Sequence, residues 1–347
     1  MTAARRGRVA VVGAGAWGTT VASLLAARTE VVLWAREEDV VASVGAHHRN
    51  DRFLPGRALH PALRATGSLA DALDGAGLVL FAVPAQHLRG VLERARPSID
   101  PTAPVLSLAK GIEEGSGRRM TEVVGEVLAD HPRHLVGAVS GPNIAGQVHD
   151  GLPAATVVAL ADEQAARAVQ ATLMAPTLRV YTNPDVVGCE VGGAVKNVVA
   201  LAAGMAAGLE LGENALAAVV TRGLAEMTRL GVALGADPLT FLGLAGIGDL
   251  MVTCHSRSSR NHQVGARLGG GEDLDSILGS MSAVAEGVRS CRPVLALGGR
   301  HGVDLPICEQ VGEVLAGRTT AAAAVDALFG RRPAAELHDL APGPPPA

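Results

Sequence analysis

The feature that most limits the fold of this chain is a glycine-rich turn near residue 15. An apolar run, Arg8–Val12, leads into the sequence GAGAWG at positions 13–18, and a helical pattern, Thr19–Ala27, follows. Gly13 permits a tight turn, Gly15 lets the backbone approach a pyrophosphate, and Gly18 lets helix and strand pack closely. A strand, such a turn and a helix in direct succession are typical of the first βαβ unit of a dinucleotide-binding domain. The pattern therefore predicts that residues 13–18 bind NAD or NADP.

The first half of the chain continues this alternation of strand and helix. Short β-branched runs alternate with longer amphipathic segments as far as about Asn183, as in a parallel sheet with helices on its faces. The expected strands are Arg8–Val12, Glu30–Trp34, Leu78–Ala82, Pro104–Leu108, His134–Ala138, Ala154–Ala159 and Leu178–Tyr181. From about Pro184 onward the strand pattern ends, and apolar residues recur at helical spacing in Val186–Leu230, Ser276–Leu297 and Ile307–Leu315.

These patterns predict an α/β protein with two domains, since 347 residues exceed the usual size of a single core. Residues 1–184 are expected to form an N-terminal Rossmann-type doubly wound sheet that binds the dinucleotide. Residues 185–335 are expected to form an all-helical C-terminal domain that binds substrate and carries the catalytic residue. The proline-rich end, residues 336–347, is predicted to be a disordered tail because it cannot pack a core.

Composition argues against several kinds of partner. The net charge of −4 gives no general attraction to nucleic acid or to an anionic membrane surface. Apolar stretches such as Val198–Ala207 are short and interrupted by glycine, so no membrane insertion is expected, and the N-terminus lacks the apolar region of a signal peptide. The four cysteines are scattered and predict free thiols rather than a metal site. We therefore expect a cytoplasmic protein in which an organic cofactor supplies the chemistry.

Only two of the 30 lysine and arginine side chains are lysines, Lys110 and Lys196. Arginine stays protonated at any ordinary pH, whereas a lysine amine can release a proton when burial lowers its pKa. Composition alone permits a simpler explanation, in which two lysines remain by accident in an arginine-rich chain. Their surroundings favour a functional one, because Lys110 follows the apolar run Val105–Leu108 and Lys196 lies in a helical pattern of small residues. Both lysines are predicted to belong to an active site.

The residues after the second expected strand bear on the choice of cofactor. An NAD-selective site usually places an acid there, about 20 residues after the glycine turn, to bind the ribose 2′-hydroxyl. This chain has Arg36, which suits the 2′-phosphate of NADP, followed by Glu37 and Glu38, which suit the ribose of NAD. Arg36 is equally well explained as an ordinary solvated side chain. We expect NADP(H) to be preferred and NAD(H) to be accepted.

The most specific stretch lies between residues 246 and 261. The sequence GIGDLMVTC at 246–254 is followed by Ser258–Asn261, so one carboxylate, several hydroxyls, an amide and a guanidinium gather in a glycine-rich connection. Such a set suits a polar, phosphorylated ligand, on which Arg260 would provide a bidentate grip. Taken alone, the stretch is explained as well by a solvated loop before a helix. Together with the two lysines, it favours a phosphate-binding active site.

Ten short motifs occur in order between about Val9 and Phe329. They are Gly13–Gly18, Ala82–Pro84, Lys110–Gly111, Ser140–Pro142, Gly192–Asn197, Asn214–Ala215, Thr221–Met227, Gly248–Leu250, Ser259–Asn261 and Glu286–Gly287. In this order they resemble the bacterial NAD(P)-dependent glycerol-3-phosphate dehydrogenases. So many ordered matches are far more specific than any one motif.

The resemblance implies reversible reduction of dihydroxyacetone phosphate to sn-glycerol 3-phosphate by NADPH or NADH, at the entry to glycerophospholipid synthesis. Lys196 matches the family's proton-transferring lysine, and Lys110 matches the lysine that touches both substrate and cofactor. The residues at the family's glycerol-phosphate positions are Gly141, Asn143, Asp249, Ser259, Arg260 and Asn261. Those at its cofactor positions are Ala16, Trp17, Arg36, Ala145, Val284 and Glu286, with Arg260 shared.

The sequence departs from the family pattern at Asn143, where the family has Ser or Thr. Two alternative functions also remain at this point. One is a related two-domain reductase of hydroxy or keto acids, because Arg260 suits a carboxylate as well as a phosphate. The other is a dinucleotide sensor without catalysis, which would leave Lys110 and Lys196 unexplained. The apolar helical domain predicts a homodimer.

Overall fold

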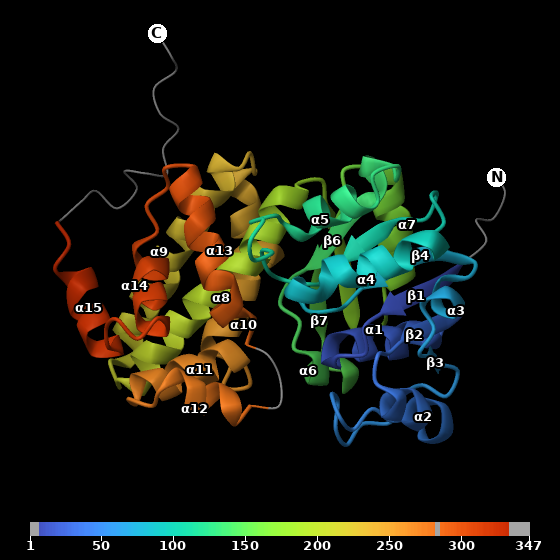
Figure 1. The fold of residues 1–347 in the computed structure, drawn as a ribbon, viewed down its shortest axis with the longest axis horizontal. Helices are drawn as coiled ribbons and strands as arrows, with labels where there is room; N and C mark the ends of the chain where they lie inside the picture. The colour runs from blue at the N-terminus through green and yellow to red at the C-terminus, as the bar shows by residue number, and fades with distance from the viewer. Residues whose placement is uncertain (1–6, 282–284, 333–347) are drawn as a thin grey trace, which may run out of the picture. The chain divides into compact units, whose positions relative to one another are not determined.

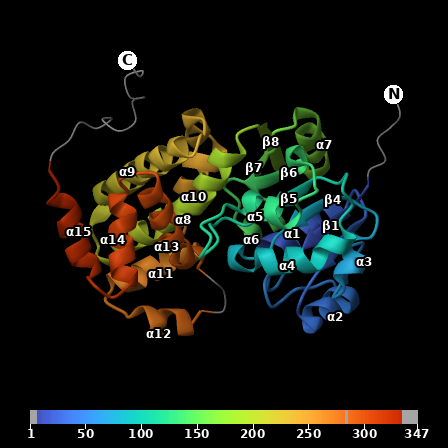
Figure 2. The same ribbon diagram turned by 45° about the horizontal axis from the view of Figure 1, so that its top comes forward.

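The computed structural model describes residues 7–281 and 285–332, which form two compact units. The N-terminal unit comprises the described residues up to Lys110 together with Arg118–Val186. The helical unit comprises Gly111–Gly117 and the described residues from Val187 onward. Figures 1 and 2 colour both units along the chain. The expected tail at 336–347 and the expected cofactor residue Val284 lie outside the described residues.

The N-terminal unit is built on an eight-stranded sheet in the order β3-β2-β1-β4-β5-β6-β7-β8. Neighbouring strands are parallel except β6 and β7, which are antiparallel. The strands are β1 (Arg8–Val12), β2 (Val31–Trp34), β3 (Arg64–Thr66), β4 (Ala76–Phe81), β5 (Val105–Ser107), β6 (Val136–Ser140), β7 (Ala154–Ala159) and β8 (Leu178–Asn183). This is the Rossmann-type doubly wound sheet that the alternating pattern predicts.

Helices cover both faces of this sheet. They are α1 (Ala16–Ala26), α2 (Glu38–His47), α3 (Leu69–Leu73), α4 (Leu88–Ala95), α5 (Met120–Val127), α6 (Ala145–His149) and α7 (Glu163–Leu173), with 3₁₀ turns at Ala85–His87, Arg96–Ser98 and Arg133–Leu135. Successive residues of β1 point to opposite faces. Val9 and Val11 pack with α1, α2, α6 and α7, whereas Ala10 and Val12 pack with α3, α4 and α5. Both faces of the strand are therefore buried, which explains its continuous apolar sequence.

Three of the differences from the sequence-based expectation have a clear local cause. The strand β3 was not expected, because Arg64–Thr66 is a short, partly exposed edge strand without an apolar pattern. The strand β6 begins at Val136 rather than at His134, because a 3₁₀ turn follows Pro132. The helix α1 begins at Ala16, inside the glycine motif, because Gly15 already occupies its N-cap position.

Among the described residues of the helical unit, the regular elements are helices, as the periodicity predicts. They are α8 (Val186–Gly208), α9 (Gly212–Ala233), the 3₁₀ helix η4 (Pro238–Leu242), the π-helical turn η5 (Leu244–Gly248), α10 (Asp249–His255), α11 (Arg260–Gly269), α12 (Leu274–Gly279), α13 (Glu286–Arg300), α14 (Pro306–Leu315) and α15 (Ala321–Phe329). The segment Gly111–Gly117 joins this unit, and its Ile112 packs into the same apolar core.

The helix α8 forms the centre of the helical unit, as both ribbon views show. It is long and apolar enough to cross a membrane by length and composition alone. However, 83% of its most apolar window is buried inside the protein, and its side chains form much of the core of this unit. A core helix explains these properties. Small residues such as Gly204, which lies against the backbone of α11, allow neighbouring helices to approach closely.

Candidate active site

The glycine turn at the start of α1 has the geometry that the sequence predicts. Gly13 has φ +118°, and a Cβ atom there would lie 2.7 Å from the carbonyl oxygen of Ala82. A Cβ atom on Gly18 would collide with the carbonyl oxygen of Gly13. By contrast, nothing lies within 4 Å of the corresponding position on Gly15, which is the N-cap of α1. The backbone at Gly15 is thus open to a ligand, beside a helix N-terminus that favours a phosphate group.

This turn lies where the strand order of the sheet reverses. The strand β1 pairs with β2 on one side and with β4 on the other, so its carboxyl end is a topological switch point. Ligands of doubly wound sheets bind in the crevice outside the strand ends at such a point. Ala16 and Trp17, two expected cofactor residues, lie in the first turn of α1 and are partly exposed. The open backbone at Gly15, the N-terminus of α1 and the position at the switch point therefore fit a dinucleotide.

The end of β2 carries a charged pair. The guanidinium of Arg36 donates two hydrogen bonds to Glu37 Oε1, from Nη2 at 2.7 Å and from Nε at 3.1 Å. The side chain of Arg36 is 71% exposed and that of Glu37 only 15%. Glu37 also occupies the N-cap position of α2. A ligand that binds at the end of β2 would therefore contact the Arg36 guanidinium while this cation is paired with the Glu37 carboxylate.

Lys110 and Gly141 come together at the ends of the neighbouring strands β5 and β6. Lys110 Nζ donates a hydrogen bond of 2.8 Å to the carbonyl oxygen of Gly141, whose φ is +133°. Asn143, two residues further on, donates from Nδ2 to the carbonyl oxygen of Ala155 on β7 at 2.9 Å. That bond fixes the orientation of the Asn143 amide. Ala145 begins α6, and its carbonyl oxygen accepts a hydrogen bond from the hydroxyl of Thr20 on α1 at 3.2 Å.

Lys196 lies in the middle of α8 and is buried, with 6% of its surface exposed. Its Nζ donates to Asp249 Oδ1 at 2.5 Å and to Thr253 Oγ1 at 2.8 Å. Asp249 is 1% exposed, and the Thr253 hydroxyl in turn donates to the Asp249 carbonyl oxygen at 2.6 Å. Charge-assisted bonds of this kind are strong where water is excluded. The ammonium is therefore held in one place by two residues of α10.

Next to Lys196, an amide network joins three helices. Asn261 Nδ2 on α11 donates to Asn197 Oδ1 on α8 at 2.9 Å, and Asn261 Oδ1 accepts from the Gly287 N–H on α13 at 2.9 Å. Asn197 Nδ2 donates to the Gly193 carbonyl oxygen one turn earlier in α8. Asn197 lies in the interior of α8, so its side chain does not cap a helix. The two amides fix the spacing of α8, α11 and α13.

The N-terminus of α11 presents a cation. Ser259 is its N-cap, and its Oγ accepts a hydrogen bond from the backbone N–H of His262. Arg260 follows at the first helical position, next to the carboxylate of Glu286. Burial of part of the side chain lowers the pKa of Arg260, and Glu286 acts against that shift. Arginine remains charged throughout, so this position is suited to an anion.

The stretch 246–254 is helical rather than a loop, which corrects the expectation of a glycine-rich connection. Residues Leu244–Gly248 form the π-helical turn η5, and Asp249–His255 form α10. Gly246 allows this arrangement because a Cβ atom there would collide with the backbone of Phe241. The helical arrangement brings Asp249 and Thr253 onto one face, since residues four apart on a helix are neighbours. That spacing could have revealed Thr253, which we did not single out.

The sequence predicts that the four cysteines are free thiols, and the structure confirms this. Cys189, Cys254, Cys291 and Cys308 are free and buried. Burial raises the pKa of the Cys254 thiol to about 12, and Asp249 adds to that rise while Lys196 opposes it. Cys254 is therefore an unreactive core residue beside Lys196. Within residues 7–281 and 285–332, no cluster of three or more His, Cys, Asp or Glu side chains is arranged to hold a metal.

Comparisons with known proteins cover both units. The N-terminal domain of the NAD-dependent glycerol-3-phosphate dehydrogenases matches residues 8–166, and the C-terminal domain of the same family matches residues 185–326. A glycerol-3-phosphate dehydrogenase [NAD(P)+] of Parafrankia is 50% identical over 332 residues, which are 95% of this chain and 99% of the relative. One of Sphingopyxis alaskensis is 48% identical over 314 residues, covering 90% of this chain and 93% of the relative.

Solved structures lead to the same family. The crystal structure of glycerol-3-phosphate dehydrogenase from Coxiella burnetii superposes with a TM-score of 0.89 at 36% identity, covering 94% of this chain and 99% of that one. The sequence matches and the structural match extend over both units. The chain belongs to the NAD-dependent glycerol-3-phosphate dehydrogenase family.

Proposed function

We propose that the chain catalyses the reversible reduction of dihydroxyacetone phosphate to sn-glycerol 3-phosphate with NADPH or NADH. Its product is the backbone of the glycerophospholipids, so the reaction opens their synthesis. The observation that carries the proposal is the buried Lys196, held at 2.5 Å by Asp249, in a chain that belongs to this family. In this proposal, residues 1–184 bind the nucleotide and residues 185–335 carry the residue that transfers the proton.

Lys196 acts as the general acid and base. A bound nicotinamide would supply the hydride, and negative charge would develop on the C2 oxygen of the substrate. The Lys196 ammonium donates its proton to that oxygen: an N–H bond breaks, an O–H bond forms, and the neutral amine takes a proton from solvent. In the oxidation direction, the neutral amine accepts the hydroxyl proton. Asp249 stabilises the ammonium, and Thr253 fixes the position of Nζ.

The remaining expected residues bind the two ligands. Lys110, held at the Gly141 carbonyl, touches substrate and cofactor, and Arg260 at the N-terminus of α11 holds the substrate phosphate. Gly141, Asn143, Asp249, Ser259 and Asn261 complete the substrate positions. Gly13, Gly15, Ala16, Trp17, Gly18, Arg36, Ala145, Val284 and Glu286 complete the cofactor positions. Asn143 Nδ2 already donates to the carbonyl oxygen of Ala155 on β7. We therefore assign the side-chain oxygen of Asn143, Oδ1, to the contact with the ligand.

NADP(H) is the preferred cofactor in this proposal, since Arg36 suits the 2′-phosphate. Glu37 acts against that preference, because its carboxylate pairs with the Arg36 guanidinium and repels a phosphate. NAD(H) is accepted for the same reason. The Glu37 carboxylate and the Arg36 guanidinium together thus set the ratio of activity with NADPH to activity with NADH.

The protein acts as a homodimer in the cytoplasm. Leu239 and Leu242 are 69% and 68% exposed, and both lie in the short 3₁₀ helix η4. Residues three apart in such a helix lie one above the other, so the two leucines form a single apolar ridge. Exposed apolar ridges mark contact surfaces, and a second copy of the same chain is the commonest partner.

One assay tests the reaction. Purified protein is mixed with NADPH or NADH, and loss of the reduced cofactor is followed with dihydroxyacetone phosphate, a 2-keto acid or a 3-oxo acid. We expect turnover with dihydroxyacetone phosphate only. Turnover with an acid alone would favour the related reductases, and cofactor binding without any turnover would favour a sensor.

A further inference from the structure

Asn50 lies outside every cofactor and substrate position named above, yet its side chain touches the glycine turn. It follows α2 in the chain and is 1% exposed. Its Nδ2 donates to the carbonyl oxygen of Ala14 at 2.8 Å and to Thr19 Oγ1 at 2.8 Å. The Thr19 hydroxyl also donates to the Ala14 carbonyl oxygen, at 3.0 Å. Two side chains from different segments thus converge on one carbonyl of the motif.

That carbonyl belongs to the peptide group between Ala14 and Gly15. A trans peptide is planar, so its C=O and N–H groups point in opposite directions. Because the Ala14 oxygen is directed to Asn50 and Thr19, the Gly15 N–H is directed away from them. Glycine peptides rotate more readily than others, since no Cβ atom restricts them. A bond to the Ala14 oxygen therefore fixes which way the N–H faces.

Asn50 is itself held firmly. Its Oδ1 accepts from the Phe53 backbone N–H at 3.3 Å, and its carbonyl oxygen accepts from the Leu54 N–H at 2.8 Å. Further along this segment, Arg57 forms two hydrogen bonds of 2.7 Å with Asp150, just after α6. The segment is thereby attached at both ends, and the amide of Asn50 has one orientation.

We propose that Asn50 is a positioning residue for the dinucleotide, which holds the Ala14–Gly15 peptide so that the Gly15 N–H meets the pyrophosphate. This inference rests on the cofactor site of the proposed function and adds a residue to it. The pyrophosphate is common to NADH and NADPH, so Asn50 contributes equally to the binding of both. Its effect is on cofactor affinity and not on the chemical step.

The test is the nearly isosteric variant Asn50→Asp. The introduced carboxylate has no N–H to donate and repels the Ala14 oxygen, so the peptide loses its restraint. We expect Kd for NADH and NADPH to rise roughly ten- to a hundredfold, while kcat at saturating cofactor changes less than about threefold. When the pH is lowered until the introduced carboxyl is protonated, its O–H can donate to Ala14, and the affinity should recover relative to wild type.

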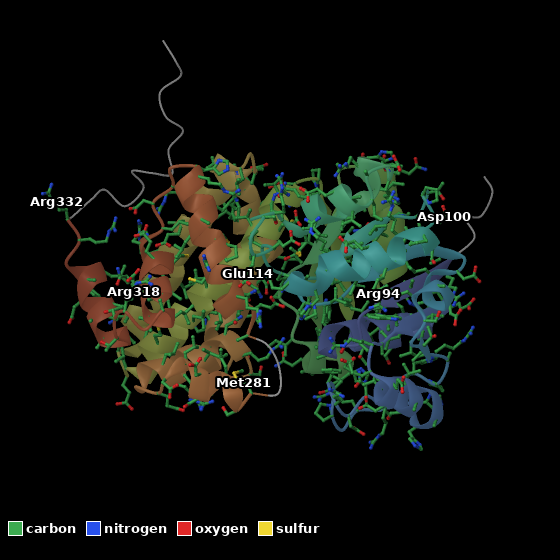
Figure 3. The ribbon with its side chains drawn as sticks, viewed as in Figure 1. Arg94, Asp100, Glu114, Met281, Arg318 and Arg332 are labelled. Carbon is green, nitrogen blue, oxygen red and sulfur yellow. The ribbon has the colours of Figure 1, made fainter. Side chains whose placement is uncertain are left out.

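Binding is measured by tryptophan fluorescence, which suits this chain. It has two tryptophans, and Trp17 lies in the first turn of α1 beside the glycine turn. The other, Trp34, is 3% exposed, donates to the Gly67 carbonyl oxygen and lies under Arg94 of α4, which Figure 3 labels. Because NADH is titrated without substrate, the result is independent of whether dihydroxyacetone phosphate is reduced.

Two further variants separate positioning from folding. Asp51→Asn makes the reverse exchange in the next residue, whose Oδ1 bonds to the Gly56 N–H, and should leave Kd unchanged. Thr19→Val removes the second donor to Ala14 together with the acceptor of one Asn50 hydrogen bond, but it keeps the bond from Asn50 to Ala14. It should therefore weaken cofactor binding by a smaller factor, which gives a result even if Asn50→Asp does not fold. Unchanged Kd in Asn50→Asp, or in Thr19→Val if only that variant folds, would overturn the proposal. So would weaker binding that acid does not restore in Asn50→Asp.

Discussion

At the scale of single residues, the buried ion pair between Lys196 and Asp249 is the centre of the proposed chemistry. The pair is 2.5 Å long, and its two side chains are 7% and 2% exposed. Taking both charges out of water is costly, and partners with good geometry offset that cost only in part. The acid–base role that we propose for Lys196 would explain why the chain keeps the pair despite this cost.

The first prediction is that Lys196→Arg keeps the charge and loses the reaction. Arginine cannot release its proton at any ordinary pH, so it can stabilise the developing oxyanion without protonating it. We expect kcat for dihydroxyacetone phosphate to fall about 10²- to 10⁴-fold, with little change in Kd for NADH. Steady-state kinetics and a cofactor titration check this. A near-normal kcat would remove the acid–base role from Lys196.

The second prediction concerns Glu37. Glu37→Gln removes the carboxylate that pairs with Arg36 and would repel a 2′-phosphate. Exposed ion pairs contribute little, so we expect kcat/KM for NADPH to rise only about two- to fivefold, with no gain for NADH. Glu38→Gln, which removes the same charge one residue further along, serves as the control. If both variants change the ratio of kcat/KM for NADPH to kcat/KM for NADH equally, the net negative charge of this region sets the ratio, and the pair with Arg36 does not.

At the scale of elements, the motif Thr221–Met227 contains a carboxylate that caps another helix. Glu226 on α9 is 1% exposed and accepts hydrogen bonds from the N–H groups of Ile307, at 2.6 Å, and Cys308, at 3.1 Å, in the first turn of α14. Burial raises the pKa of Glu226 to about 7, although these bonds and the nearby Arg229 act in the opposite direction. This motif therefore joins α9 to α14 and lies outside the proposed chemistry.

The third prediction follows from that pKa. Between pH 4.5 and about 7, folded Glu226 keeps a proton that the unfolded chain has lost, so stability falls as the pH rises through this range. The shift amounts to on the order of 3 kcal/mol. Glu226→Gln should flatten the pH dependence of the unfolding free energy in this window, as measured by urea denaturation. Glu309→Gln is the control, because Glu309 is exposed in the first turn of α14, the turn that Glu226 caps; this variant should keep the wild-type slope. A slope in Glu226→Gln as steep as that of the wild type would contradict the assignment.

At the scale of the whole molecule, the remaining question is assembly. The fourth prediction is that the double variant Leu239→Lys and Leu242→Lys is monomeric, whereas the wild type sediments as a dimer at micromolar concentration. Two charges placed on the apolar ridge would be buried without partners in the dimer. Phe329→Lys, at another exposed apolar residue, is the comparison. A dimer that survives the double variant and is lost with Phe329→Lys would place the interface on α15.

Features that depend on neighbouring residues could be predicted from the sequence alone. The tasks of Gly13 and Gly18 follow from a strand, a turn and a helix in succession, and the structure reproduces them. The helical form of α8 follows from its periodicity, whereas its core position does not, because a membrane-spanning helix has a similar length and composition. Alternation and helical periodicity predicted two parts of the chain, but they did not predict that Gly111–Gly117 belongs to the helical unit. The short edge strand β3 and the helical form of 246–254 did not follow, because they depend on what lies beside them.

Contacts between distant residues were decided only by the tertiary structure. Lys196 and Asp249 are 53 positions apart, and Asn50 and Ala14 are 36 positions apart. Both lysines could be singled out by their rarity, but no local pattern indicates which carboxylate or hydroxyl reaches Lys196. Hydrogen bonds across helices and strands depend on how the backbone packs, and packing energy is a property of the whole core. The sequence determined the family, the fold class and the candidate residues, whereas packing decided the partners that orient them.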